Sequence, residues 1–289
     1  MSKNDRSLSI KNRKKSYLRP WEKLPYISIG ILAVIILGCA FAELIMPHDP
    51  TYMNLSDISS PPGGNHIFGT DTLGRDLFSV IWYGGRISLI IGLLATLIST
   101  AIAIVYGTAS GLASQKIDDV MMRFTEILMS VPQILFVIFI QAILGDATVL
   151  SISLVLGITG WMAVAKMVRS EVQQLRTADF VMAARTMGGG FFYILWKHLM
   201  PNFMSAIMFM VVTNIGTAIA TEATLSFLGV GLPTDIISWG SLMSLSQRAM
   251  MTGAWWMLLI PGTFLVVTLI CITEIGEYLR SRNKRDRLV

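Results

Sequence analysis

Long apolar runs separated by short polar stretches dominate this sequence. A membrane-spanning helix needs about 20 consecutive, mostly apolar residues, and six runs approach or exceed that length. They cover residues 27–46, 87–112, 121–144, 149–165, 203–230 and 254–273. The fourth run is short, and glycines and Glu222 interrupt the fifth. The pattern predicts an all-α integral membrane protein with six transmembrane helices.

A polar island, residues 179–202, separates the fourth run from the fifth. Asp179 is a candidate N-cap for a first short helix, and Gly188 can adopt the left-handed conformation that often follows a helix end. A second short helix is predicted from residue 191 to about residue 199, where Pro201 is expected to stop it.

Both helices are too short to be stable alone in water, so another surface must hold them. On the first helix, Phe180, Ala184 and Met187 share one face by their i, i+4, i+7 spacing. Two interpretations are equally open from the pattern. The helices could rest on the membrane surface, or they could form a knob that fits a groove on a partner protein.

Charge supports the membrane assignment and predicts an orientation. Only 14% of the 289 residues are charged, against about 25% in soluble domains. With the N-terminus in the cytoplasm, 20 of the 23 lysines and arginines face inward, and only Arg75, Arg86 and Arg248 face outward. This bias obeys the positive-inside rule. It also explains the net charge of +5 without a nucleic-acid partner.

The same pattern divides the chain into four parts. A basic cytoplasmic tail (1–25) precedes the first transmembrane helix and an extracytoplasmic segment (26–86). The main transmembrane domain covers 87–280, and a second basic cytoplasmic tail covers 281–289.

The extracytoplasmic segment is rich in Pro, Gly, Asp and Ser. Its acid–base pairs predict a folded lid held by Asp–Arg hydrogen bonds, and a structured loop is favoured over a binding site. The chain has three histidines: His48, His66 and His198. They are too scattered in sequence to indicate a metal site. Cys39 and Cys271 lie in different apolar runs and suggest neither a disulfide nor a metal site.

Two acidic residues in the apolar runs are candidates for a transport pathway. Glu222 lies deep in the fifth run, where a charge costs roughly 3 kcal/mol near the bilayer centre. It must face a water-filled path, pair with another group or be neutral, and a structural hydrogen bond to a neighbouring helix is as plausible as a pathway role. Glu126 follows Arg123 by three residues, a spacing that predicts an ion pair at the inner border. Pro132 is then expected to bend or break that helix.

The polar island resembles the coupling motif of bacterial ABC importer permeases, in which E-A-A, three residues, Gly and nine further residues precede I-x-L-P. The matching positions are Ala183, Ala184, Gly188, Met200 and Pro201. Met182 stands where Glu is usual, and His198 where an aliphatic residue is usual. Further blocks around 66–89, 119–132 and 221–240 resemble the C-type permeases of the branch that imports dipeptides, oligopeptides, nickel and metal–opine chelates. The resemblance covers about residues 20–282.

The resemblance implies a function and a set of partners. The chain would form half of the path for small peptides or metal chelates in a bacterial inner membrane. A second homologous permease, two ABC ATPase subunits and an extracytoplasmic solute-binding protein would complete the transporter. The polar island would be a cytoplasmic coupling helix that docks on the ATPase. The implied coupling residues are Asp179, Ala183, Ala184, Arg185, Gly188, His198 and Pro201.

The sequence has no G-x-x-x-x-G-K-[ST] phosphate loop, and it contains no Gly-Lys dipeptide at all. ATP is therefore expected on the partner subunits, with no cofactor on this chain. No constellation of catalytic residues indicates an enzyme. The alternative function is a secondary transporter driven by an ion gradient, with Glu222 as its proton or cation site, and the energy source distinguishes the two.

Overall fold

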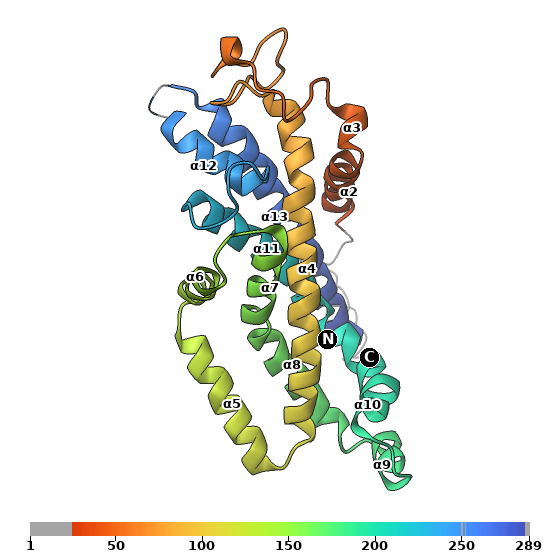
Figure 1. Cartoon of the computed structure of the whole chain (residues 1–289). Helices are drawn as coiled ribbons and strands as arrows, with labels where there is room; N and C mark the ends of the chain where they lie inside the picture. Colours follow the sequence, from red (N-terminus) through yellow and green to blue (C-terminus); the bar gives the residue numbers. More distant parts are fainter. Residues whose placement is uncertain (1–24, 250, 252, 287–289) are drawn as a thin grey trace, which may run out of the picture.

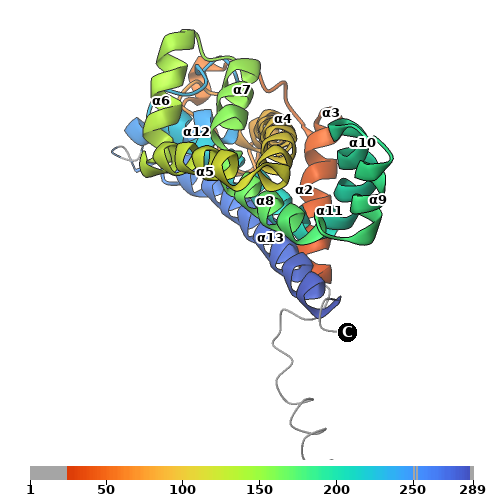
Figure 2. The same cartoon turned by 90° about the horizontal axis from the view of Figure 1, so that it is seen from below.

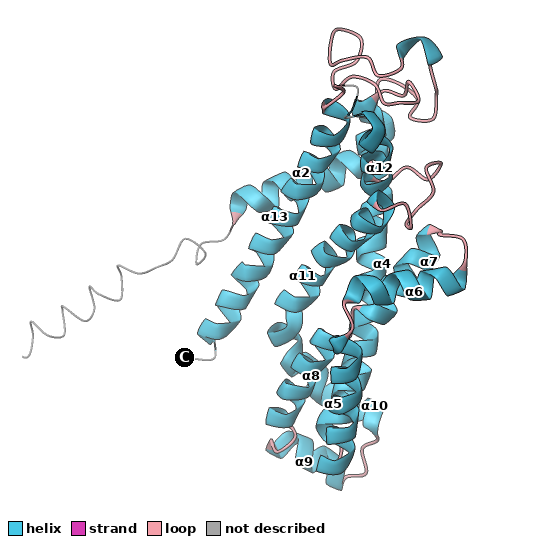
Figure 3. Ribbon diagram, turned by 90° about the vertical axis from the view of Figure 1, so that its left-hand side faces the viewer, coloured by secondary structure: helices cyan, strands magenta, loops and turns pink. Residues whose placement is uncertain are grey.

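The computed structural model describes residues 25–249, 251 and 253–286. Most of the predicted N-terminal tail, including all eight of its basic residues, therefore lies outside the described residues. Within the described part, helices, turns and loops make up the chain, and one isolated backbone bridge joins Thr70 and Asp76. This all-α architecture agrees with the prediction (Figure 3).

The chain folds into a succession of helices joined by mostly short loops (Figure 1). In order, they are α2 (Tyr26–Ala40), α3 (Ala42–Ile45), a 3₁₀ turn (Leu55–Asp57), α4 (Leu77–Leu112), α5 (Gln115–Ser130), α6 (Gln133–Leu144), α7 (Val149–Thr159), α8 (Met162–Leu175), α9 (Asp179–Thr186), α10 (Phe191–Ile194), a π-helical stretch (Leu195–Leu199), α11 (Met200–Phe227), α12 (Trp239–Ala249) and α13 (Trp256–Asp286).

Three continuous helices in the described part are long and apolar enough to cross a membrane. They are α4, the continuous helix Phe191–Phe227 and most of α13. The α5–α6 pair, bent by 88°, and the α7–α8 pair, bent by 44°, raise the number to five if each pair is one span. Helix α2 has 15 residues, fewer than the ~20 that a full crossing needs. Six crossings therefore stay a prediction.

The bend at Pro132 is confirmed. Helix α5 ends at Ser130, and α6 starts directly after Pro132. The proline has no N–H to donate, so backbone carbonyls at the end of α5 lose their partners. The Ser130 hydroxyl donates to the carbonyl oxygen of Ile127 at 2.7 Å and satisfies one of them.

The predicted stop at Pro201 is wrong. Pro201 occupies the first turn of α11, which continues to Phe227. Inside a regular α-helix the proline ring would clash with the carbonyl of the preceding turn. The preceding stretch, Leu195–Leu199, is π-helical, and its wider turn gives the proline ring room. The chain therefore passes from α10 into α11 without a break.

Two other boundaries differ from the predicted ones. Helix α4 begins at Leu77 and not near residue 87, because Asp76 caps its start by accepting a hydrogen bond from the Ser79 amide at 2.9 Å. Helix α13 continues to Asp286, so the predicted tail from residue 281 is helical as far as that residue.

Helix α4 is the central element of the bundle and packs against α2, α7, α8, α11 and α12 (Figure 2). Small residues let the helices approach closely, as is typical of membrane helix pairs. A Cβ atom added at Gly107 would lie 2.6 Å from the carbonyl oxygen of Ala165 and 2.8 Å from Cβ of Val168, both in α8. Gly92 meets Ile219 of α11 in the same way.

A buried carboxylate joins three helices near one end of the bundle. Asp118 of α5 is 5% exposed and accepts hydrogen bonds from both Nε and Nη2 of Arg169 in α8, at 2.6 and 2.5 Å. Gln173 of α8 and Ser110 of α4 also donate to it, at 2.9 and 2.5 Å. A two-pronged Arg–carboxylate contact is both strong and directional, so α5 is held to α8.

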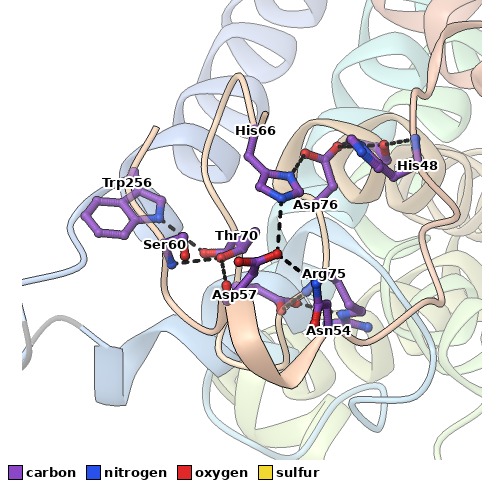
Figure 4. A network of polar contacts seen from close by, with 11 residues as sticks. His48, Asn54, Asp57, Ser60, His66, Thr70, Arg75, Asp76 and Trp256 are labelled. Carbon is purple, nitrogen blue, oxygen red and sulfur yellow. Dashed lines mark hydrogen bonds and ion pairs between the residues drawn. The ribbon is translucent and has the colours of Figure 1, made fainter. Parts of the chain in front are cut away.

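The loop segment, residues 46–76, is folded, as its acid–base pairs predict (Figure 4). Arg75 and Asp71 are both buried and form an ion pair at 2.7 Å between Nε and Oδ2. Trp256 of α13 donates its indole N–H to the carbonyl oxygen of Thr70 at 3.2 Å. The loop segment therefore packs on the start of α13.

The close approach of α4 and α8 predicts that Gly107→Ala destabilises the protein. The new methyl group meets backbone and side chain of α8, and overpacking of this kind costs about 1–3 kcal/mol. Gly30→Ala is the matched control, because Gly30 lies within a helix but has no atom within 4 Å of the added carbon. Thermal unfolding in detergent should show a lower midpoint for Gly107→Ala and an unchanged or higher one for Gly30→Ala. Equal midpoints for the two variants would contradict the packing argument.

Candidate functional site

The polar island lies at the end of the molecule opposite the loop segment, and Figures 1 and 3 agree on this arrangement. Helix α9 begins with Asp179, which is its first residue and not its cap. Ala178 takes the cap position, and no side chain bonds there. The helix ends at Thr186, and Gly188 has a φ of +82°. The left-handed conformation predicted for Gly188 is therefore confirmed.

The bundle itself holds the two short helices. Their inward side chains are buried in the same hydrophobic cluster as residues of α8 and α11. The inward residues are Val181, Ala184, Ile194, Leu195 and Leu199, and their partners in the cluster include Val168, Val172, Phe203 and Ile207. This anchorage explains how the eight-residue α9 persists, whereas α10 is the first turn of the continuous helix Phe191–Phe227.

The face predicted from Phe180, Ala184 and Met187 is wrong as a single surface. Ala184 is buried, whereas Phe180 is 41% and Met187 87% exposed. Met187 lies beyond the last helical residue of α9, so helical spacing no longer positions its side chain. Val181, three residues before Ala184, shares the inward face instead.

The outward face of the polar island combines apolar and charged side chains. Its large exposed apolar residues are Phe180, Met182, Met187, Phe192, Tyr193 and Trp196. Asp179, Arg185 and Lys197 are exposed beside them. The His198 ring lies 6.2 Å from that of Phe180 and 5.5 Å from that of Tyr193, so it bridges the two short helices. An apolar surface with charges among its members is typical of a protein interface.

Of the predicted coupling residues, Ala183 and Pro201 are exposed, as are Asp179 and Arg185, whereas Ala184 faces inward. Gly188 has no neighbouring atom within 4 Å of an added Cβ. All of the predicted set except Ala184 are thus exposed or half-buried, and their coupling role stays a prediction.

Glu222 has the environment of a structural hydrogen-bonding centre. It is 0% exposed, and one of its carboxylate oxygens accepts from Ser226 at 3.0 Å and from Ser238 at 2.9 Å. The other accepts from Ser88 of α4 at 3.2 Å. Its contacts therefore correspond to the structural alternative, in which the carboxylate joins α11, α4 and the start of α12. A pathway role for Glu222 stays untested.

Glu126 lies beside a charged hollow between α5 and α8. It pairs with Arg123 at 3.3 Å, which confirms the expected ion pair, and with Lys166 of α8 at 3.8 Å. Asp119 and Arg169 also line this hollow.

Two further hollows adjoin each other along α11, and neither has a charged residue in its lining. The first lies between α5, α6, α8 and α11 and includes Gln133, Asn214 and Thr217. The second is lined by Gln133, Thr217, Thr221 and Thr224. Because Gln133 and Thr217 line both hollows, the polar residues of the two hollows form one continuous wall along α11.

The threonines of this wall bond their own helix. Thr217, Thr221 and Thr224 each donate their hydroxyl to the carbonyl oxygen four residues earlier, at 3.2, 2.7 and 2.7 Å. They present methyl groups and hydroxyl lone pairs to the hollow. This wall is absent from the sequence-based predictions. The signal was present, because Thr217 and Thr221 are four residues apart and Thr221 and Thr224 three, a spacing that puts all three on one helix face.

Comparison with known proteins decides the family. Residues 103–285 match the family described as the binding-protein-dependent transport system inner membrane component. The chain belongs to this family of transport permeases. Residues 22–62 also match the N-terminal TM domain of oligopeptide transport permease C. The permease is thus a subunit of a transport system and not an enzyme, and a multi-pass protein of the inner membrane.

Individual relatives agree with this assignment. The chain is 34% identical to the dipeptide transport system permease protein DppC of Bacillus subtilis, over 96% of this chain and 88% of the relative. It is 37% identical to the oligopeptide transport system permease protein OppC of the same organism, over 89% and 84%. OppC of Haemophilus influenzae is 36% identical, over 92% and 86%. These matches confirm the resemblance inferred from the sequence patterns, and such a transport system implies a binding protein and an ATPase as partners in general.

The contacts of Glu222 predict that Glu222→Leu destabilises the permease by at least about 2 kcal/mol. Three serine hydroxyls would lose their acceptor inside the bundle, and each buried unsatisfied group costs roughly 1–3 kcal/mol. Glu222→Gln keeps an acceptor oxygen and should be milder. Thr224→Val serves as the control, since Thr224 is exposed and bonds only its own helix. Thermal unfolding in detergent tests the order, and a Glu222→Leu midpoint at the control value would refute the structural role.

Proposed function

We propose that this permease forms one half of the translocation path of an ATP-driven importer of short peptides. A second homologous permease would supply the other half, two ATPase subunits the energy, and an extracytoplasmic solute-binding protein the substrate. The N- and C-termini and the polar island would face the cytoplasm, and the loop segment would face the binding protein. Family membership and the names of the peptide-transport relatives support this proposal.

The observation that carries the proposal is the exposed surface of the polar island, whose helices are held in place from the inside. Two short helices are anchored by their inner side chains, while their outer face presents large apolar residues among charges. A helix that rests on lipid would separate its apolar and charged residues onto opposite faces. Here Arg185 and Asp179 share the outward surface with Met182 and Phe180. This mixture favours the ATPase as partner over the membrane surface.

The contacts suggest how a push on this surface reaches the path. Val181 and Ala184 of α9 share a buried cluster with α8, so displacement of α9 would carry α8 with it. The Asp118–Arg169 contact would then carry α5. The charged hollow lies between α5 and α8, and the larger uncharged hollow lies between these helices and α11. Rigid-body tilting of α5 and α8 would therefore open or close the path.

The chemistry of the wall favours peptides as cargo. Gln133, Asn214 and the threonines provide hydroxyl and amide groups without a fixed charge. Such groups bond the amides that all peptides share and tolerate different side chains. These two hollows hold no His, Cys, Asp or Glu in their linings, so they offer neither imidazole nor carboxylate to a bare divalent ion. Chelated metals remain the competing cargo.

The left-handed turn at Gly188 predicts a loss of coupling in Gly188→Val. A β-branched residue is a severe outlier at positive φ, so the turn between α9 and α10 would change shape. Gly188→Asn should be tolerated, because Asn enters this conformation at lower cost. Gly190→Val is the positional control, since Gly190 has a φ of −70° and equally open surroundings.

Peptide uptake and binding-protein-stimulated ATPase activity should be measured on the assembled transporter in proteoliposomes. The expected result is uptake reduced about tenfold or more for Gly188→Val alone, at unchanged subunit assembly. Normal uptake by Gly188→Val would sink the coupling proposal. Uptake by the wild-type transporter that continues without ATP but collapses with the membrane potential would instead favour the secondary transporter.

The wall along α11 predicts that Thr217→Trp blocks import, because the indole would fill the space shared by both hollows. Thr273→Trp on α13 is the control: Thr273 is also exposed and also bonds the carbonyl four residues earlier. Cells that lack the chain should be complemented with each variant and offered a labelled dipeptide, then Ni²⁺ with and without a chelating carrier. Loss of dipeptide uptake in Thr217→Trp alone is expected. Loss of chelated Ni²⁺ uptake with unaffected peptide uptake would replace peptides by metal chelates.

A further inference from the structure

The loop segment brings together three potential metal ligands that are far apart in sequence (Figure 4). His48 follows α3, His66 lies in the middle of the segment, and Asp76 caps α4. One ligand atom from each lies within 4.8 Å of the others. Nδ1 of His66 is 2.9 Å from Oδ1 of Asp76, and Nδ1 of His48 is 3.9 Å from Oδ2. The two imidazole rings are 5.1 Å apart between centroids.

We propose that His48, His66 and Asp76 bind a divalent transition-metal ion such as Zn²⁺. Two imidazoles and one carboxylate form a ligand set that suits Zn²⁺, with a fourth position left for water. The site belongs to the loop segment, at the opposite end of the molecule from the polar island (Figure 1), and its residues line neither of the α11 hollows. It would be a structural clamp and not a cargo site.

Two of the three ligands are already fixed in position. The Asp76 side chain is 1% exposed, and its Oδ2 accepts from the amide and hydroxyl of Ser79 at 2.9 and 2.6 Å. Its Oδ1 therefore faces His66. The His66 side chain is only 17% exposed. A metal site built on held side chains needs little reorganisation on binding.

A further carboxylate stands behind His66. Oδ2 of Asp57 lies 4.0 Å from Nε2 of His66, and the Asn54 amide donates to the same oxygen at 2.7 Å. With the metal on Nδ1, the Nε2–H would point toward Asp57. Carboxylates in this position orient ligating histidines and raise their basicity.

His48 separates this proposal from a simple polar network. His66 and Asp76 form a hydrogen bond without any ion, but the His48 ring, at 3.9 Å, is too far from Asp76 for one. Its backbone amide donates to the Ser79 hydroxyl at 3.3 Å and fixes the residue beside Asp76. The side chain is 44% exposed and has room to move onto an ion. A bound ion would draw the ring inward and join the end of α3 to the start of α4.

The chain itself supplies matched variants. It has three histidines, of which His198 lies in the polar island. His48→Gln and His66→Gln each remove one proposed ligand, and the glutamine amide can still donate to Asp76. His198→Gln is the control. The purified full-length chain, in lipid nanodiscs and with a histidine-free affinity tag, should be titrated with Zn²⁺ by calorimetry, and its thermal midpoint measured with and without Zn²⁺.

One Zn²⁺ per chain and a Zn²⁺-dependent rise of the midpoint are expected for the wild type and His198→Gln. Each of the other two variants should weaken binding by more than about tenfold, since loss of even an outer-shell partner costs 10–100-fold. No binding by the wild type, or full binding by His48→Gln, would reduce the cluster to a polar network only. If His66→Gln is unstable without metal, His48→Gln decides alone, because its ring is partly exposed and makes no metal-free hydrogen bond to Asp76.

Discussion

Inside a bilayer, every backbone N–H and C=O must find a partner within the protein, because lipid offers none. At three positions where a helix of this permease begins or is interrupted, a local group or a local change of helix type therefore replaces the missing backbone partner. At Pro132 a serine hydroxyl bonds a freed carbonyl. At Pro201 a π-helical stretch carries the chain through without a gap. The start of α4 is closed by the Asp76 carboxylate. Side-chain acceptors and donors, and a local change of helix type, thus keep the backbone satisfied where the helices begin or bend.

What the sequence could and could not predict depends on how far apart the interacting residues lie in the chain. The all-α character, the break at Pro132 and the turn at Gly188 depend on residues that are close together in the chain, and all three are found. The Arg123–Glu126 pair, three residues apart, is also found. The rule that a proline stops a helix gives the wrong result at Pro201, because the effect of a proline depends on the turn before it.

Contacts between distant residues explain the larger omissions. Asp118 bonds Arg169, 51 positions away, and Glu222 bonds Ser88, 134 positions away. Neither partnership leaves a periodic trace in the sequence. His48 and His66 look scattered until the loop segment folds back and brings their ring centroids to 5.1 Å from each other. The resemblance to importer permeases singled out the polar island, but only the structure shows which of its side chains face inward.

The threonine wall of α11 has a consequence beyond a single round of transport. The hydroxyl protons of its three threonines are already committed to the helix backbone, so these residues would offer a solute only acceptors. If the wall lines the proposed path, selection among solutes would fall mainly to the subunit that binds the solute first. Organisms could then import new substrates by exchanging that subunit alone, while a permease of this kind is inherited unchanged.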